Sequence, residues 1–270
     1  MNAKPVVLIG AGRMGGALLR GWATHRIAPL IVVEPLPSRP LRTLARRHHI
    51  KLFANIDSVV TAQARACIVA LKPQVLKSEA VRLRPLAQSG ALMLSIAAGT
   101  NTAALRKAWG QKARIVRAMP NTPGAIGRGI TALFAAKRTS AKDKTLAALL
   151  LSALGEIVWV KSEAQIDSVT AVSRSGPAYV FLLVEALAEA AEAQGLPPAL
   201  AAKLARATVA GSGALLDAEP SAASRLRQNV TSRGGTTEAA LKILMATDGL
   251  SALIQRAVAA ARQRARELGS

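Results

Sequence analysis

A glycine-rich turn close to the start of the chain constrains the fold more than any other feature. Residues 10–15, Gly10-Ala11-Gly12-Arg13-Met14-Gly15, form a G-x-G-x-x-G pattern between the apolar run Val6–Ile9 and a stretch with helical spacing. The first glycine permits a tight turn, the second lets the backbone approach a pyrophosphate, and the third lets the helix pack on the strand. The helix N-terminus adds free N–H groups and a partial positive charge. This context predicts a dinucleotide site rather than an ordinary glycine-rich turn.

Short runs typical of strands alternate with stretches typical of helices as far as Val160. Such alternation indicates parallel β-α-β units with helices on both faces of one sheet. Helices between the strands include Met14–Thr24 and Lys142–Leu154. The expected strands are Val6–Ile9, Leu30–Val33, Lys51–Phe53, Cys67–Leu71, Leu92–Ile96, Ile115–Arg117, Thr131–Phe134 and Ile157–Val160.

After Glu163 the strand pattern stops, and the apolar residues recur at helical spacing. The fold class predicted is therefore α/β, with an N-terminal Rossmann-like doubly wound domain at 1–162 and an all-helical domain at 163–270. The helices expected there are Pro177–Gln194, Pro198–Asp217, Ser221–Asn229, Thr237–Thr247 and Leu250–Leu268.

The helical half is rich in alanine, and aromatic residues make up only 3% of the whole chain. A helical unit of this composition has a thin core of its own. Burying its apolar faces against a second copy would remedy that, so we expect a homodimer through the C-terminal half.

The chain is strongly basic, with 36 Lys and Arg against 15 Asp and Glu and a formal net charge of +21. The basic residues are scattered along the whole length, and no basic stripe is interleaved with aromatic residues. We therefore expect a solvated basic surface that attracts small anions, and not a nucleic-acid partner.

Location follows from what the chain lacks. No run approaches the ~18 apolar residues of a membrane span, and the first apolar run is too short for a signal peptide. The single cysteine, Cys67, cannot form an internal disulfide, which suits a reducing compartment. We expect a cytoplasmic protein without a membrane partner.

The loop after the second expected strand bears on the choice of dinucleotide. Glu34 lies 24 residues after Gly10, where an acid commonly bonds to the adenosine ribose of NAD. Ser38 and Arg39 follow in the same loop and suit the 2′-phosphate of NADP. The signals are mixed, and both NADH and NADPH stay open.

Further cofactor contacts are expected where other strands end, because the carboxyl ends of parallel strands meet at one edge of the sheet. Asn55 follows the third strand and is placed near the adenosine. Lys72 and Pro73 follow the fourth strand and are placed beside the cofactor, although a simple surface charge accounts for Lys72 equally well.

The positions of the three histidines limit the kinds of catalysis expected of this chain. All three (His25, His48 and His49) belong to the first domain, and the helical domain has neither His nor Cys. A dehydrogenase driven by histidine and a metal site are therefore not expected. The remaining candidates for a functional site are hydroxyls and backbone N–H groups in two stretches at the starts of helices, Ser173–Tyr179 and Thr231–Thr237. Such residues also serve as simple helix caps, but two of these loops beside a dinucleotide site favour a carboxylate pocket.

Over nearly its whole length the chain resembles the 1-pyrroline-5-carboxylate reductase family. The resemblance rests on Gly10–Gly16, Ala70–Gln74, Ser95–Gly99, Arg117–Pro123 and the two hydroxyl-bearing stretches. It implies a Rossmann domain, a helical dimerisation domain, and dimers that often assemble into decamers. It also implies the reduction of 1-pyrroline-5-carboxylate to L-proline, the last step of proline synthesis, with NADPH or NADH as hydride donor.

The resemblance further implies roles for individual residues. Thr237 is the implied catalytic residue and would hydrogen-bond the ring nitrogen. The residues expected around the substrate are Ser175, Ser232, Gly234, Gly235, Thr236 and Thr237. Those expected around the cofactor are Gly10, Gly12, Arg13, Met14, Gly15, Glu34, Ser38, Arg39, Asn55, Ala70, Lys72, Pro73 and Ala97.

The chemistry agrees with the lack of a strong acid. A protonated cyclic imine is already an electrophile, so hydride can add at its carbon once the ring is held and its carboxylate is neutralised.

Three positions depart from the family pattern. Arg174 stands where the family usually has glycine, Arg233 where it usually has proline, and Arg13 where it often has Asn or Gln. Arg13 is placed to reach the cofactor phosphates. If that glycine adopts a positive φ, Arg174 would strain its loop. Arg233 adds a cation beside the expected carboxylate. Two alternatives follow: a reductase of a related cyclic imino acid, or a non-catalytic dinucleotide-binding protein.

Overall fold

The computed structural model describes residues 4–27, 29–59 and 63–269, which divide into two compact units. The first unit comprises the described parts of Met1–Arg174 and Arg262–Ser270, and the second is Ser175–Ala261. This division falls later in the chain than residue 162, because Ile166 and Val169 pack against Met119 and Ala132 of the sheet. A domain boundary between residues 162 and 163 therefore stays a prediction.

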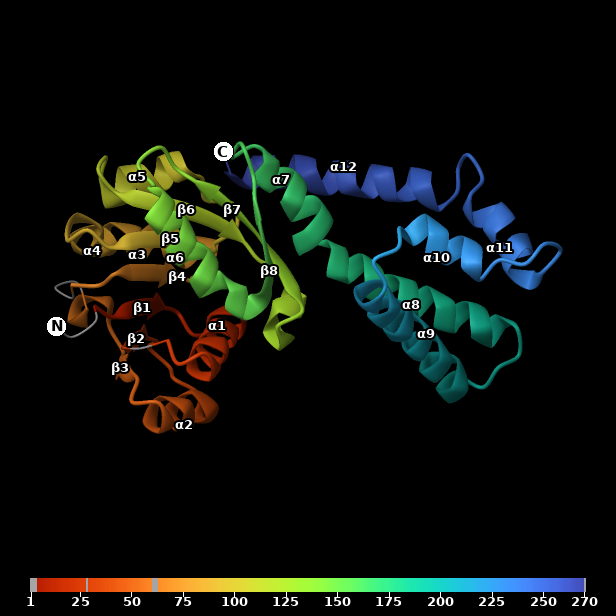
Figure 1. The fold of residues 1–270 in the computed structure, drawn as a ribbon, viewed down its shortest axis with the longest axis horizontal. Coiled ribbons are helices and arrows are strands. Elements are labelled where there is room, and N and C mark those ends of the chain that lie inside the picture. Colours follow the sequence, from red (N-terminus) through yellow and green to blue (C-terminus); the bar gives the residue numbers. More distant parts are fainter. Residues whose placement is uncertain (1–3, 28, 60–62, 270) are drawn as a thin grey trace. The chain divides into compact units, whose positions relative to one another are not determined.

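The first unit contains one eight-stranded sheet with the strand order β3-β2-β1-β4-β5-β6-β7-β8 (Figure 1). The strands are β1 (Val6–Ile9), β2 (Leu30–Val33), β3 (Lys51–Phe53), β4 (Ala66–Val69), β5 (Leu92–Ser95), β6 (Arg114–Met119), β7 (Gly129–Ala135) and β8 (Gly155–Trp159). All eight expected strands are present. One pairing differs from the expected parallel order, since β7 runs antiparallel to β6. The connection between these two strands is residues 120–128 with the 3₁₀ helix Thr122–Ile126, and a parallel pair needs a crossover of a dozen or more residues.

Helices cover both faces of the sheet, as expected for a doubly wound fold. On one face Val6 and Leu8 pack with α1 (Arg13–Thr24), α2 (Arg39–Arg47) and α6 (Ala141–Leu151). On the other face Val7 and Ile9 pack with α3 (Pro73–Glu79), α4 (Arg84–Gln88) and α5 (Thr102–Trp109). Because successive residues of β1 point to opposite faces, this strand anchors two cores and its carboxyl end is held rigidly.

A buried ion pair ties β6 to the end of the first unit. The Arg117 side chain is 5% exposed, and its guanidinium lies 3.0 Å from Glu163 and 3.9 Å from Asp167 in α7 (Gln165–Val169). The Glu163 carboxylate also accepts bonds from the N–H (2.7 Å) and hydroxyl (2.6 Å) of Thr102. Glu163 thus connects the sheet, the start of α5 and the segment before α7.

The end of the chain returns to the first unit. Asn101 caps α5 by accepting a bond from the N–H of Ala104 (2.8 Å), and it donates one to the carbonyl of Gly269 (3.0 Å). Gly99 has φ +68°, and a Cβ there would lie 2.8 Å from the carbonyl oxygen of Leu268. The last turn of α12 (Leu250–Gly269) therefore packs on the loop that follows β5.

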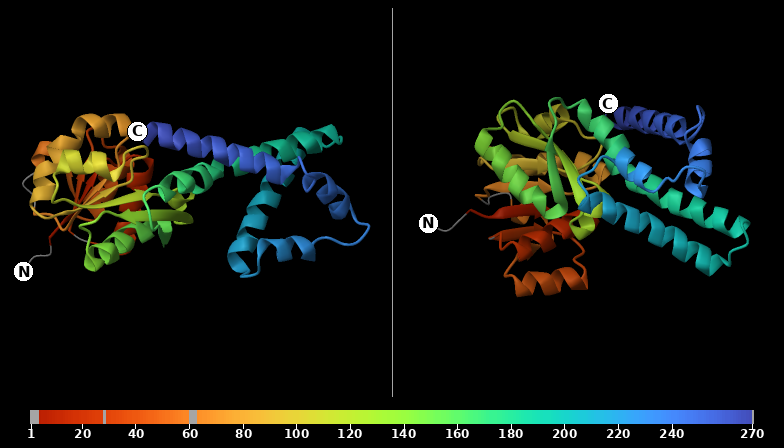
Figure 2. Two further views of the ribbon diagram at one scale, coloured as in Figure 1. Left: turned by 90° about the horizontal axis from the view of Figure 1, so that it is seen from above. Right: turned by 45° about the vertical axis from the view of Figure 1, so that its right-hand side comes forward.

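The second unit consists of helices. Its other elements are α8 (Gly176–Ala193), α9 (Pro198–Ala218), α10 (Ala223–Asn229) and α11 (Thr236–Leu244). All five expected helices are present, and α8 and α9 lie side by side (Figures 1 and 2). A turn of π-helix, Thr170–Arg174, precedes α8.

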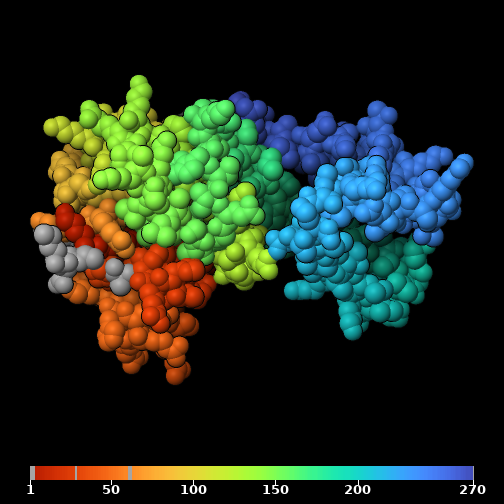
Figure 3. Space-filling model, in the orientation of Figure 1, coloured from red at the N-terminus to blue at the C-terminus, as the bar shows by residue number. Residues whose placement is uncertain are grey.

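Residues 175–261 are all described, and among them only Ala201 and Ala205 are buried. Large apolar side chains stand on the surface instead; Phe181 is 60% exposed, Leu182 62% and Ile243 75%. Figure 3 shows the surface of this unit in teal to blue. Apolar exposure on this scale is typical of a surface that a partner covers.

The free thiol of Cys67 lies inside β4 and is fully buried. Burial raises the pKa of Cys67 to about 12, because a thiolate loses its hydration there. We expect the native chain at pH 8 to leave Ellman's reagent unreacted, and the chain unfolded in guanidinium to react at one thiol. Rapid reaction of the native chain would mean that β4 opens readily.

No helix in the described part of the chain combines the length and the apolar character that crossing a membrane requires.

Candidate active site

The three glycines of the turn after β1 have different physical roles. Gly10 has φ +88°, and a Cβ there would lie 2.8 Å from the carbonyl oxygen of Ala70. A Cβ on Gly15 would overlap the carbonyl oxygen of Gly10, so only glycine lets α1 approach the turn this closely. Gly12 is the N-cap of α1, and a Cβ there would meet no atom within 4 Å. Gly10 and Gly15 therefore shape the turn, whereas Gly12 leaves open space in front of the helix N-terminus.

The turn lies at the switch point of the sheet, since β1 is flanked by β2 on one side and β4 on the other. Ligands of doubly wound proteins bind at such a point, outside the carboxyl ends of the strands. A groove of about 560 Å³ adjoins the turn, and Gly12, Arg13, Met14 and Ser38 line it. No side chain caps the N-terminus of α1, so its N–H groups are available to a phosphate. This arrangement fits a dinucleotide.

Glu34 connects the end of β2 to the turn. Its Oε2 accepts a hydrogen bond from the N–H of Ala11 (2.9 Å), and its Oε1 accepts one from the N–H of Leu36 (3.3 Å). Ser38 caps α2, because its hydroxyl accepts a bond from the N–H of Leu41 (3.4 Å). Arg39 is the first residue of α2 and is exposed.

The other predicted cofactor residues follow the carboxyl ends of β3, β4 and β5. Asn55 precedes a 3₁₀ turn, and Ala70 donates its N–H to the carbonyl of Ile9 (2.8 Å). Lys72 is exposed just before α3, and Ala97 is buried after β5. These residues share one edge of the sheet but do not line the groove, so their contacts with a cofactor stay predictions.

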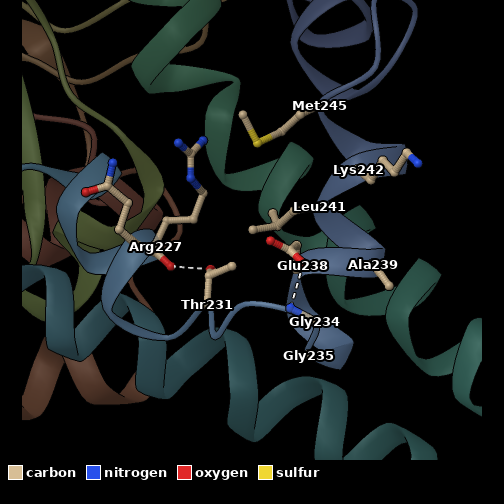
Figure 4. A pocket seen from close by; sticks show the side chains of 10 residues that line it. Arg227, Thr231, Gly234, Gly235, Glu238, Ala239, Leu241, Lys242 and Met245 are labelled. Carbon is tan, nitrogen blue, oxygen red and sulfur yellow. Dashed lines mark hydrogen bonds between the residues drawn. The ribbon is translucent and has the colours of Figure 1, made fainter.

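In the second unit, the start of α11 lies beside a pocket of about 690 Å³ (Figure 4). Gly234 and Gly235 line it together with Arg227, Thr231 and Glu238. The N–H of Gly234 donates to Glu238 (2.8 Å), and the hydroxyl of Thr231 donates to the carbonyl of Arg227 (2.7 Å). These bonds hold the glycine-rich segment against its own helices.

The remaining predicted substrate residues are not part of this pocket's lining. Ser232 is exposed and lies close to Gly235, where a Cβ would come within 2.5 Å of the Ser232 hydroxyl oxygen. Thr236 and Thr237 open α11, so their N–H groups point away from the helix body without an intrahelical acceptor. Ser175 lies at the start of α8. Their grouping around one substrate stays a prediction.

The strain considered for Arg174 is absent. Among the described residues, the non-glycine positions with positive φ are Arg26 and His49, whereas Arg174 belongs to the π-helical turn before α8. Arg233 is exposed. The left-handed conformation in this segment belongs to the next residue, Gly234 (φ +72°), and not to Arg233. Neither arginine has a positive φ.

Two residues of the site are not among those predicted from the sequence. Arg20 lines the groove with Arg13, and the signal was their spacing of seven residues, which puts both on one face of α1. Glu238 holds Gly234, and its position in the first turn of α11 is one where an acid favours a helix.

Two family models match separate parts of the chain. Residues 5–99 match "NADP oxidoreductase coenzyme F420-dependent", and residues 163–268 match "Pyrroline-5-carboxylate reductase dimerisation". Together with the turn and groove, these matches define the class: an oxidoreductase that uses a nicotinamide dinucleotide.

Individual relatives define the family. A pyrroline-5-carboxylate reductase of Pseudomonas aeruginosa is 36% identical, with 99% of this chain and 98% of that protein covered. One of Synechocystis is 38% identical, with 97% of each covered. Among solved structures, the Coxiella burnetii enzyme has a TM-score of 0.90 at 34% identity, with both chains covered completely. That of Plasmodium falciparum, with NADP bound, has a TM-score of 0.83 at 27% identity, again over both whole chains.

The chain belongs to the pyrroline-5-carboxylate reductase family. The predicted resemblance, fold class, reductase reaction and class of cofactor are therefore confirmed.

Proposed function

We propose that this chain reduces 1-pyrroline-5-carboxylate to L-proline with hydride from NADPH or NADH. The observation that carries the proposal is the open N-terminus of α1 at the sheet's switch point, in a chain with full-length relatives of this family. The bound dinucleotide supplies a hydride, and the chain's own residues hold the reactants.

The first unit holds the dinucleotide. The free N–H groups at Gly12–Gly15 and the helix dipole of α1 receive the pyrophosphate, and the guanidinium of Arg13 adds a positive charge in the same groove. Gly12 is needed here because any side chain would occupy the space that the phosphates take.

The second unit holds the substrate. The N–H groups of Gly234 and Gly235 already donate to Glu238 and to the carbonyl of Ser232, so they are not available to a ligand. The N–H groups of Thr236 and Thr237 are the ones left to receive a carboxylate. The hydroxyl of Thr237 then accepts a hydrogen bond from the protonated ring nitrogen, which becomes the secondary amine of proline when hydride adds at the neighbouring carbon.

Activity is tested by following the oxidation of NADPH and of NADH at 340 nm, with the imine as substrate. Turnover with either dinucleotide supports the proposal. Absence of turnover with both, in a chain that binds them, would contradict it and would favour a non-catalytic dinucleotide-binding protein.

Thr237→Ala is expected to lower kcat by roughly tenfold while the Kd of the dinucleotide changes less than twofold, because one hydrogen bond to a charged group is lost. Thr237→Ser keeps the hydroxyl and should retain most of the activity. Stopped-flow rates and fluorescence titration measure the two quantities, and wild-type kcat in Thr237→Ala would remove this residue from the mechanism.

We further propose a homodimer built through residues 163–270, supported by the exposed Phe181, Leu182 and Ile243. Sedimentation velocity is expected to give a dimer or a multiple of it; a decamer would match what the resemblance implies. A monomer at micromolar concentration would contradict the proposal.

The buried single cysteine supports a cytoplasmic location, which fractionation of the producing cells would test.

A further inference from the structure

One carboxylate stands in an otherwise basic part of the chain. Between residues 4 and 56 Glu34 is the only Asp or Glu, against nine Lys and Arg. The nine are Lys4, Arg13, Arg20, Arg26, Arg39, Arg42, Arg46, Arg47 and Lys51. A lone acid at the end of β2, next to the phosphate-binding turn, works against the general attraction of this region for anions. Its position therefore calls for a specific role.

Hydrogen bonds hold the Glu34 carboxylate in place. One oxygen accepts from the N–H of Ala11, inside the glycine-rich turn, and the other accepts from the N–H of Leu36 in the following loop. Turning the side chain away would leave the N–H of Ala11 without this acceptor, so the negative charge cannot easily withdraw from a second anion.

The neighbouring groups that suit a phosphate are partly engaged or exposed. The hydroxyl oxygen of Ser38 accepts the cap bond of α2 and keeps its own O–H, and Arg42 donates its Nε–H to the carbonyl of Pro37 (3.1 Å) and keeps its terminal N–H groups. Arg39 is exposed. Water and salt weaken the attraction between an exposed guanidinium and a phosphate, whereas the Glu34 carboxylate is partly buried and is held beside the turn by two N–H donors.

We propose that Glu34 makes this chain select NADH over NADPH. Its carboxylate accepts hydrogen bonds from the hydroxyls of the adenosine ribose and repels a phosphate esterified at the 2′ position. The inference rests on the proposed function only in that a nicotinamide dinucleotide is bound, and not on the imine that is reduced.

Binding tests the proposal without any turnover. Calorimetry compares 5′-ADP with adenosine 2′,5′-bisphosphate, and fluorescence titration compares NADH with NADPH. We expect the wild-type chain to bind the ligands without a 2′-phosphate at least about tenfold more tightly, the effect of one charged hydrogen-bonding group. Tighter binding of the 2′-phosphorylated ligands by the wild-type chain would overturn the proposal, whatever any variant does.

Glu34→Gln keeps an amide oxygen as acceptor for the N–H of Ala11 but removes the charge. It is expected to weaken NADH binding and to reduce the preference from about tenfold to less than about threefold. Glu156→Gln, at an exposed position of β8, makes the same change of net charge and should leave the preference within twofold of wild type. An unchanged preference in Glu34→Gln would assign selection elsewhere. Failure of the proposed reaction would leave these binding results intact, so the two proposals fail separately.

Discussion

Replacing Gly12 with valine is expected to abolish dinucleotide binding while leaving the fold intact. A Cβ at this position meets no protein atom within 4 Å, and the backbone (φ −64°, ψ −158°) is open to any residue. Valine is a poor N-cap, so we allow a loss of about 1 kcal/mol in the free energy of unfolding. The branched side chain would nevertheless fill the space in front of the N–H groups of α1. Fluorescence titration with NADH should show a Kd at least about a hundredfold higher, the loss of a set of charged hydrogen bonds.

Gly15→Ala provides the opposite case. Its Cβ would overlap the carbonyl oxygen of Gly10, so α1 must move away from the turn and Tm should fall clearly. Thermal unfolding followed by circular dichroism separates the two variants. If Gly12→Val bound NADH with nearly wild-type affinity, the pyrophosphate would have to lie elsewhere and the assignment of the turn would be wrong.

Removing the Glu163 carboxylate is expected to have the largest effect on stability. Glu163→Ala leaves the guanidinium of Arg117 in a site where its side chain is 5% exposed, and it removes both acceptors from Thr102. Breaking a buried ion pair by removing one partner typically costs about 3–5 kcal/mol. We expect the lower end, about 3 kcal/mol, since Asp167 stays 3.9 Å from Arg117 and Glu163 is partly exposed. Urea unfolding measures the difference.

The double variant Arg117→Met with Glu163→Leu tests the cause. It removes both charges, so no unpaired cation is left inside, and part of the lost stability should return. If Glu163→Ala alone unfolded within about 1 kcal/mol of wild type, the network would be a minor contributor and water would be solvating Arg117.

The strands near the turn were predicted closely because their sequence signal is simple. For β1, β2 and β3 the predicted and observed bounds coincide. The sequences of β1 and β2 are short apolar runs bounded by loop residues, which are typical of a buried strand. Beyond β5 the hydrophobic pattern predicted the presence of the strands but not the direction of each strand in the sheet. The direction of β7 depends on the length of the connection from Met119 to Gly129, which periodicity does not encode.

Some residues of the site could be assigned a role from the sequence, and others could not. The motif identified Gly10, Gly12 and Gly15, because their spacing follows from the geometry of a strand, a turn and a helix. The role of Glu34 was open, since the residues of one loop suited NAD and NADP equally well. Its bond to the N–H of Ala11 joins residues 23 positions apart, and no local pattern reveals such a bond.

The amino-acid sequence by itself determined the order of strands and helices, the position of the phosphate-binding turn, and the resemblance to a family. These features depend on the spacing of residues that lie close together in the sequence, so they can be recognised without the fold. The tertiary structure alone decided which N–H groups are already engaged, that Arg174 lies in a helical turn without a positive φ, and that Glu34 is held against the turn. Hydrogen bonding and close packing join residues distant in sequence, so these outcomes exist only once the chain has folded.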